Sequence, residues 1–186
     1  MIIMLAGKIK SGKTTFAEEI MKLLPTVQRV SFGDMVKERY AVATNTSIVE
    51  LHDVSMKEKH RKKIVEFGDY LRATDRYCIA RDLFNAIDID NMDYVIDDLR
   101  AIEELELGTA LGAIPYKIHA SPLVRKARGW IPNPAVDEHY LENEMDLSKE
   151  TYKVFGGDVL YNDTMSLQTL RQEVSRFVAL NLRKHL

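Results

Sequence analysis

The sequence has almost no cysteine and no long apolar run. Only one of its 186 residues is a cysteine, Cys78, which excludes an internal disulfide. A lone thiol is typical of a reducing compartment, so we expect a cytoplasmic protein. The apolar run at residues 2–6 is far shorter than the roughly 18 residues that span a bilayer, and too short for a secretory signal. The sequence therefore predicts no membrane partner.

The sequence also has no large excess of charge of either sign. The chain has 26 Lys and Arg against 28 Asp and Glu, a net charge of -2, and a pI near 6.2. Proteins that bind nucleic-acid polymers are normally basic, so that class is disfavoured. Hydrophobic content of 46% and charged content of 29% are those of an ordinary globular protein. The length predicts one domain, residues 1–186, with a lid insertion at about 121–150.

The most informative segment is a glycine-bounded loop near the start of the chain. Residues 7–14 read GKIKSGKT and match the phosphate-binding pattern G-x-x-x-x-G-K-[ST]. An apolar strand precedes the loop, and Phe16, Ala17 and Ile20 follow it at helical spacing, so it opens a helix whose N-terminus favours phosphate. A glycine-rich turn with chance lysines is the alternative, which this context disfavours. The predicted nucleotide-binding residues are Gly7, Lys8, Lys10, Ser11, Gly12, Lys13, Thr14 and Thr15.

Apolar segments then alternate along the chain. We expect helices at about 13–24, 34–43, 57–73, 76–87, 101–111 and 166–184, and further strands at about 27–32, 94–97, 116–119 and 157–161. Asp34 is expected to cap the second helix and Ser166 the last. Five short strands alternating with helices predict an α/β, three-layer P-loop NTPase fold, in which helices cover both faces of a five-stranded parallel sheet. The strand before the loop should be central.

Charged residues after the strands predict contacts with a metal and with anions. Ligands of an open parallel sheet bind beyond the carboxyl ends of its strands, where Asp97, Asp98 and Arg100 follow the third strand. Asp98 could hold Mg²⁺ together with Thr14, although capping of the next helix is an alternative for one of the two aspartates. Arg100 suits bidentate binding of an anion. Lys37 could reach an anion above the sheet, and a solvated lysine is equally compatible.

Residues 121–150 differ in character from the segments before them. Arg125 and Arg128 lie three residues apart on a short predicted helix and share one face. Prolines, a glycine and an acidic stretch follow them. Because a phosphotransferase must keep water away from the transferred group, the segment predicts a lid whose arginines close onto that group. A surface excursion with exposed arginines is the alternative.

Several segments together resemble the deoxynucleoside monophosphate kinases of bacteriophages, which are P-loop kinases of small metabolites. They are GKIKSGKT at 7–14, SFGDMVK at 31–37, FGDYLR at 67–72, DLR at 98–100 and HYLENEMD at 139–146. The resemblance implies Mg²⁺-dependent transfer from ATP to a (deoxy)nucleoside monophosphate. It implies that the catalytic residues are Lys13, Asp98, Arg125 and Arg128. The residues that it implies for acceptor binding are Asp34, Lys37, Arg72, Arg100, Trp130 and Glu142. It also implies that Asn162 and Thr164 lie beside the donor base. A monomer and a homodimer both stay open.

Animal-type phosphomevalonate kinases are also similar to this sequence. They share a GKxKSGK loop and an Arg-Gly-Trp step like the one at 128–130. Thr14, Asp34 and His139 favour the nucleotide enzymes, whereas the Arg-Gly-Trp step favours the phosphomevalonate enzymes, and residues 105–112 depart from the nucleotide pattern. A nucleotide-dependent switch or binding protein is a further alternative. The guanine-reading Asn-Lys-x-Asp sequence is absent, which disfavours a GTPase.

Overall fold

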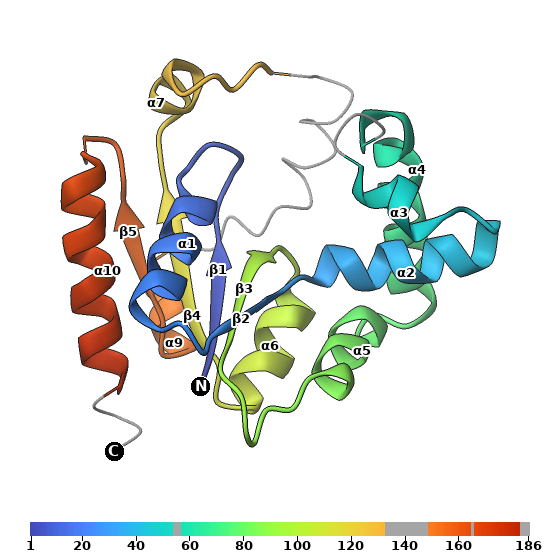
Figure 1. The fold of residues 1–186 in the computed structure, drawn as a ribbon, viewed down its shortest axis with the longest axis horizontal. Helices are drawn as coiled ribbons and strands as arrows, with labels where there is room; N and C mark the ends of the chain where they lie inside the picture. The colour runs from blue at the N-terminus through green and yellow to red at the C-terminus, as the bar shows by residue number, and fades with distance from the viewer. Residues whose placement is uncertain (54–56, 133–148, 165, 183–186) are drawn as a thin grey trace. The chain divides into compact units, whose positions relative to one another are not determined.

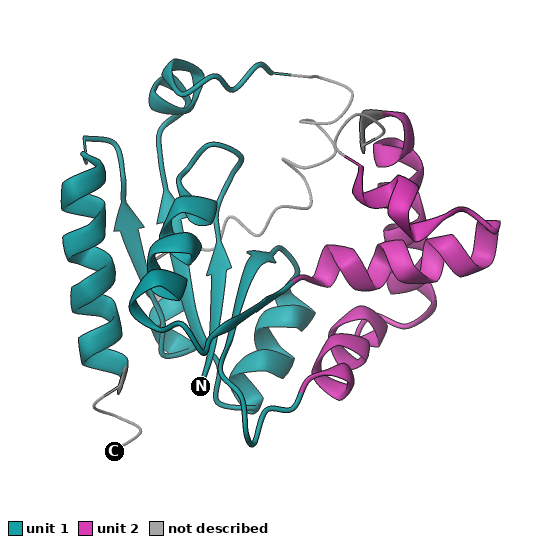
Figure 2. Cartoon of the chain, in the orientation of Figure 1, with its two compact units in different colours: residues 1–30, 88–186 teal, residues 31–87 magenta. Residues whose placement is uncertain are grey.

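The structure of the protein is a computed structural model that describes residues 1–53, 57–132, 149–164 and 166–182. The chain divides into two compact units (Figure 2). Unit 1 comprises residues 1–30 and 88–186, and unit 2 comprises residues 31–87. Within the described ranges, no helix is long and apolar enough to cross a membrane.

Unit 1 is built on a parallel sheet of five strands in the order β2-β3-β1-β4-β5 (Figure 1). The strands are β1 (Ile2–Ala6), β2 (Gln28–Val30), β3 (Tyr94–Leu99), β4 (Ile114–His119) and β5 (Asp158–Tyr161). β1 pairs with β3 on one side and with β4 on the other, so the strand before the loop is central, as predicted. All of β1 is buried, the pattern of a strand covered on both faces.

The helices of unit 1 cover both faces of this sheet. Its described helices are α1 (Lys13–Leu23), α6 (Ile102–Ala110), α7 (Pro122–Ala127), α9 (Lys149–Val154) and α10 (Leu167–Leu182). Phe16 of α1 and Phe177 of α10 pack with Ile3 of β1 in one core cluster, whereas α6 and α9 contact β1, β4 and β5. The predicted three-layer α/β fold is therefore confirmed.

Unit 2 is helical in its described part. Its helices are α2 (Phe32–Thr44), α3 (Ile48–His52), α4 (Lys57–Thr74) and α5 (Cys78–Ala86). Phe32 of α2 contacts Phe84 of α5 edge to face, with ring centroids 5.9 Å apart. Tyr40 of α2 contacts Phe67 of α4 in the same geometry at 5.6 Å. Such aromatic pairs contribute about 0.5–1.5 kcal/mol beyond their buried area, and they fix α2 against α4 and α5.

The start of α2 differs from the prediction that Asp34 caps it. Phe32 already lies in the helix, so Ser31 is the capping residue and its Oγ accepts a hydrogen bond from the N–H of Asp34 at 3.3 Å. Asp34 thus lies in the first turn, where its negative charge still favours the helix N-terminus. The predicted cap of α10 is confirmed, because Ser166 Oγ accepts from the N–H of Thr169 at 3.1 Å.

Tyr116 of β4 makes the stability of the fold decrease at alkaline pH. Its ring packs against Phe16 and Phe177, at centroid distances of 5.5 and 4.6 Å. Burial, aided by the charge of Asp158, raises the pKa of the Tyr116 phenol to about 12 from 10.0. The unfolded chain therefore releases this proton at lower pH than the folded chain. The stability from neutral Tyr116 is complete below pH 10 and is lost as the pH rises toward 12.

We expect Tyr116→Phe to remove the loss of stability that ionisation of Tyr116 causes at alkaline pH. This loss should amount to about 1–2 kcal/mol of unfolding free energy once partial solvent exposure is allowed for. The measurement is the free energy of unfolding in urea at a series of alkaline pH values. Tyr161→Phe is the control, because Tyr161 is 55% exposed and should keep the wild-type slope. Equal slopes for Tyr116→Phe and the wild type would contradict the prediction.

Candidate active site

The loop between β1 and α1 requires glycine at both of its ends. Gly7 has φ +141° and Gly12 has φ +108°, values that residues with a side chain rarely adopt. A Cβ on Gly7 would lie 2.2 Å from the carbonyl oxygen of Ile118 in β4. A Cβ on Gly12 would lie 2.5 Å from Nδ2 of Asn162. The loop is therefore packed tightly against the strands beside it.

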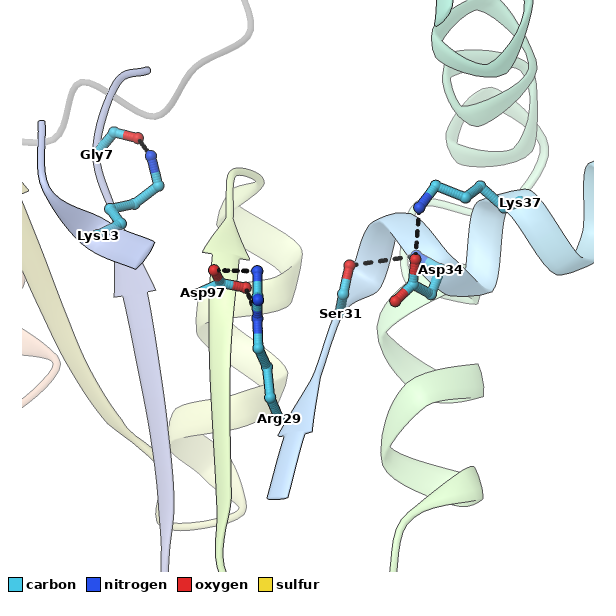
Figure 3. A network of polar contacts seen from close by, with 7 residues as sticks. All are labelled: Gly7, Lys13, Arg29, Ser31, Asp34, Lys37 and Asp97. Atoms are coloured by element: carbon cyan, nitrogen blue, oxygen red, sulfur yellow. Dashed lines mark hydrogen bonds and ion pairs between the residues drawn. The ribbon is translucent and has the colours of Figure 1, made fainter. Parts of the chain in front are cut away.

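Lys13, the first residue of α1, turns its ammonium group back toward the start of the loop. Its Nζ donates to the carbonyl oxygen of Gly7 (Figure 3) and, at 3.2 Å, to that of Lys8. This places a cation next to the N-terminus of α1, which itself carries partial positive charge and free N–H groups. Lys10 is exposed and has φ +62° although it is not glycine. The segment can therefore bind an anion with its backbone and with side-chain charge.

Arg128, which directly follows α7, contacts the outside of the loop. Its Nη1 lies 3.3 Å from the carbonyl oxygen of Ser11 and 3.5 Å from that of Lys10. Its Nη2 donates to the carbonyl oxygen of Asn162 at 2.7 Å and lies 3.4 Å from Oδ1 of the same residue. The guanidinium thus joins the loop to the residue that follows β5.

Arg125 of α7 also reaches the loop, but by a weaker contact. Its Nη1 is 3.5 Å from the carbonyl oxygen of Ile9, at the limit of a hydrogen bond. The Arg125 guanidinium stacks on the indole of Trp130, 3.9 Å from the ring centroid, and the residue is 5% exposed. Cation–π contacts of this kind contribute about 0.5–2 kcal/mol. The structure therefore brings both predicted lid arginines to the loop, and holds Arg125 against the predicted acceptor residue Trp130.

The turn after β5 binds the loop from a second direction. Asn162 is 3% exposed, and its Nδ2 donates to the carbonyl oxygen of Ser11 at 2.8 Å. Asp163 accepts from the N–H of Ser121 at 2.6 Å, and its hydrogen bonds with Ser121 lower the pKa of the Asp163 carboxyl. Thr164 is exposed. Of the two residues expected beside the donor base, Asn162 therefore uses its amide on the loop.

The acidic end of β3 is divided between two roles. Asp97 is 6% exposed and binds Arg29 of β2 through both oxygens, with Nε–Oδ1 at 3.1 Å and Nη2–Oδ2 at 2.6 Å (Figure 3). The register between β1 and β3 shifts within this part of the ladder. Asp98 is half-buried. The Asp97 carboxylate is thus engaged by Arg29, and Asp98 stays the predicted metal ligand. Arg29 was missed at the sequence level.

The donor chemistry of this region fits Mg²⁺. A threonine hydroxyl from Thr14 and a carboxylate from Asp98 are hard oxygen ligands, which Mg²⁺ prefers. The described residues contain no group of three or more His, Cys, Asp or Glu that could hold a metal ion. Mg²⁺ in nucleotide sites needs no such group, because one or two protein oxygens act together with phosphate oxygens and water.

The turn from β3 into α6 is capped by Glu104 rather than by either aspartate. The Glu104 carboxylate accepts from the N–H of Arg100 at 2.9 Å and from the N–H of Ala101 at 3.0 Å. Glu104 is 2% exposed, so this cap is rigid and fixes the backbone at Arg100. The N-cap residue of α6 is Ala101, so neither Asp97 nor Asp98 occupies that position. The side chain of Arg100 is exposed.

In unit 2, the two predicted acceptor cations pair with carboxylates of their own helices. Lys37 Nζ lies 2.6 Å from Oδ1 of Asp34 (Figure 3), and Arg72 Nη1 lies 3.7 Å from Oδ1 of Asp69. Partly exposed pairs of this spacing contribute only about 0.2–1 kcal/mol, so an incoming phosphate could replace the carboxylates. Glu142 and most of the predicted lid, residues 133–148, lie outside the described residues.

Comparisons with known proteins agree with this fold. Three solved structures are similar to this chain over nearly their whole length. TT1252 from Thermus thermophilus has 20% sequence identity and a TM-score of 0.55, with 96% of each chain covered. A shikimate kinase from Bacteroides thetaiotaomicron has 14% identity, a TM-score of 0.54 and 97% of each chain covered, and a shikimate kinase from Aquifex aeolicus vf5 has 17% identity, a TM-score of 0.50 and 98% of each chain covered. No curated protein matches. The family model described as phosphomevalonate kinase matches residues 5–110. The match spans more than half of the chain and includes the loop, β3 and α6, so this chain belongs to the phosphomevalonate kinase family.

Proposed function

We propose that this chain transfers the γ-phosphoryl group of ATP to the phosphate of a small phosphorylated acceptor, a nucleoside monophosphate. The observation that carries the phosphotransfer is the loop at 7–14 with the Lys13 ammonium on the carbonyl oxygens of Gly7 and Lys8. The choice of a nucleoside monophosphate rests on the resemblance of residues 31–37, 67–72 and 98–100 to the deoxynucleoside monophosphate kinases. Membership of a kinase family supports a phosphotransferase that uses ATP. The shikimate kinases among the similar structures share the fold.

On the donor side, the loop amides and Lys13 would hold the β- and γ-phosphates, with added positive charge from Lys8 and Lys10. The Thr14 hydroxyl and the Asp98 carboxylate would hold Mg²⁺, which when bound neutralises phosphate charge. In the transfer, an acceptor phosphate oxygen bonds to the γ-phosphorus while the bond from that phosphorus to the bridging oxygen breaks, and ADP leaves. Arg125, whose contact with Ile9 is long at 3.5 Å, can exchange that carbonyl for the transferred group.

On the acceptor side, Lys37, Arg72 and Arg100 would bind the phosphate that receives the new group. Asp34, Trp130 and Glu142 would contact the rest of the acceptor. The dominant requirement of phosphoryl transfer is positioning and neutralisation of charge, rather than a covalent intermediate. A set of arginines and lysines without a nucleophilic cysteine or a Ser-His pair among these residues agrees with that requirement.

Phosphomevalonate is the second candidate acceptor. The family model that matches residues 5–110 favours it, and so does the Arg-Gly-Trp step at residues 128–130. Both acceptors present a phosphate monoester to ATP, so the donor-side assignments above are the same for either. They differ in the part of the acceptor beyond the phosphate, a nucleoside or a short carboxylic acid.

The test is a coupled assay of ADP release with ATP and Mg²⁺ across deoxynucleoside monophosphates, ribonucleoside monophosphates and phosphomevalonate. We expect turnover that depends on the acceptor, and highest kcat/KM with a nucleoside monophosphate. Highest kcat/KM with phosphomevalonate would transfer the assignment to the second candidate. Slow ATP or GTP hydrolysis that no acceptor accelerates would instead indicate a nucleotide-dependent switch and refute the kinase proposal.

A further inference from the structure

Two carbonyl groups of the phosphate-binding loop, those of Lys10 and Ser11, are bound by side chains from two other segments. In this structure Ser11 O accepts from Asn162 Nδ2 at 2.8 Å and lies 3.3 Å from Arg128 Nη1. Lys10 O lies 3.5 Å from the same arginine nitrogen. These two donors come from the turn after β5 and from the residue after α7.

The two donor side chains are themselves joined. Arg128 Nη2 donates to the carbonyl oxygen of Asn162 at 2.7 Å, which is the shortest contact that this guanidinium makes in the described part of the chain. Asn162 is held in turn by its N–H, which donates to the carbonyl oxygen of His119 at 2.7 Å. Arg128, Asn162 and Ser11 thus form a closed set of contacts, which we name the carbonyl clasp.

The position of the clasp follows from the backbone it supports. Lys10 has φ +62°, in the left-handed region that disfavours a residue with a side chain by about 1–2 kcal/mol. Gly12, next to Ser11, has φ +108° and leaves room for no Cβ beside Asn162. A backbone with such angles needs external contacts to stay in place before a ligand arrives. The clasp supplies contacts to the carbonyl groups between these two residues.

We propose that Arg128 and Asn162 are positioning residues that hold the loop in its anion-binding conformation before nucleotide binds. This inference rests on the proposed phosphate-binding role of the loop and deepens it. It separates Arg128 from Arg125: both guanidinium ends of Arg128 are engaged by backbone carbonyls, whereas the Arg125 guanidinium stacks on Trp130 and lies 3.5 Å from the Ile9 carbonyl oxygen. It also gives Asn162 a task on the loop backbone instead of on the donor base, in accord with its 3% exposure.

The experiment compares Arg128→Ala and Asn162→Ala with the wild type in two measurements. The first is amide hydrogen exchange across residues 8–14 in the absence of ligand, where both variants should exchange faster. The second is calorimetric titration with MgATP and with magnesium tripolyphosphate, which has the phosphates but no base. Each variant should bind both ligands about tenfold more weakly. The double variant should lose less than the product of the two factors, because the residues share contacts.

Lys126→Ala is the matched control. Lys126 is an exposed cation on α7, two residues before Arg128, and its removal should leave loop exchange and both affinities unchanged. Arg128→Lys and Asn162→Asp keep the test available where an alanine variant fails to fold. The lysine keeps the charge without the forked donors, and the aspartate keeps the shape without the N–H donor. Both should still loosen the loop.

Three outcomes would overturn the proposal. Unchanged amide hydrogen exchange across residues 8–14 in both alanine variants would show that the carbonyl clasp does not hold the loop. Loss of affinity for MgATP but not for tripolyphosphate in Asn162→Ala would assign Asn162 to the base. A lower turnover number with unchanged affinities in Arg128→Ala would make Arg128 a catalytic residue on the transferred group. Failure of the wild type to bind either ligand would instead refute the proposed function, while the exchange measurement would still report on the clasp.

Discussion

Replacing Lys13 by alanine should lower the turnover number of the proposed phosphotransfer by about 10²–10³. The structure holds this ammonium at the start of the loop, on the carbonyl oxygens of Gly7 and Lys8. A phosphate that binds the loop would attract this charge away from the two carbonyls, and the charge is then needed most when negative charge moves from the γ-phosphorus toward the leaving oxygen. The measurement is the coupled ADP-release assay at saturating ATP and acceptor.

The Lys13 variant should keep its fold, because Lys13 is half-buried at the N-terminal end of α1 and is not part of the core cluster. Circular dichroism and the melting temperature check this point. Lys22→Ala is the matched control on the same helix: Lys22 is 61% exposed and pairs with Glu19 at 2.7 Å, a contact worth about 0–1 kcal/mol. Its turnover should equal that of the wild type. Near-normal turnover in Lys13→Ala would show that the loop takes no part in the phosphotransfer reaction.

Replacing Gly7 by alanine should damage both stability and nucleotide binding. The added Cβ would lie 2.2 Å from the carbonyl oxygen of Ile118, a backbone atom of the neighbouring strand, so either β4 or the loop must shift. The φ of +141° adds strain. Together these effects should lower stability by about 3 kcal/mol, or the melting temperature by about 6–12 °C. Affinity for MgATP should fall at least tenfold, about 1.4 kcal/mol, because the first residue of the loop moves.

Gly112→Ala separates the clash from the backbone strain. Gly112 also has a positive φ, +81°, but a Cβ there meets nothing within 4 Å. It lies between α6 and β4, away from the loop in sequence. We expect a loss of about 1 kcal/mol, a fall of about 2–4 °C in the melting temperature, and unchanged MgATP affinity. An equal effect of the two substitutions on stability would show that contact with Ile118 is not the cause of the damage at Gly7.

Local patterns were sufficient for the elements and for the loop. The apolar run at residues 2–6 predicted the central strand, and Ser166 predicted the start of α10, because each signal acts within a few residues of the chain. The cap of α2 shows the limit of such signals. Ser31 and Asp34 are both good capping residues three positions apart. In the structure Ser31 is the cap, and Phe32, the first residue of the helix, packs against Phe84.

The contacts between residues far apart in the sequence had no comparable signal. Arg29 and Asp97 are 68 residues apart, and Asn162 and Ser11 are 151 residues apart. In the second pair the acceptor is a backbone carbonyl, which every residue type possesses, so no residue identity indicates it. Knowing that β2 and β3 are neighbours would have suggested the first pair, but neighbouring strands are a property of the assembled sheet.

The amino-acid sequence alone therefore specified an anion-binding loop on the central strand of a parallel α/β sheet, because strand, glycine turn and helix N-terminus are adjacent along the chain. The tertiary structure decided the contacts between distant segments: Arg29 engages Asp97, and Arg128 and Asn162 bind the loop carbonyl of Ser11. The physical reason is the range of the interactions. Turn and helix preferences act between near neighbours, whereas these hydrogen bonds exist only after folding brings distant segments within 3 Å or so of one another.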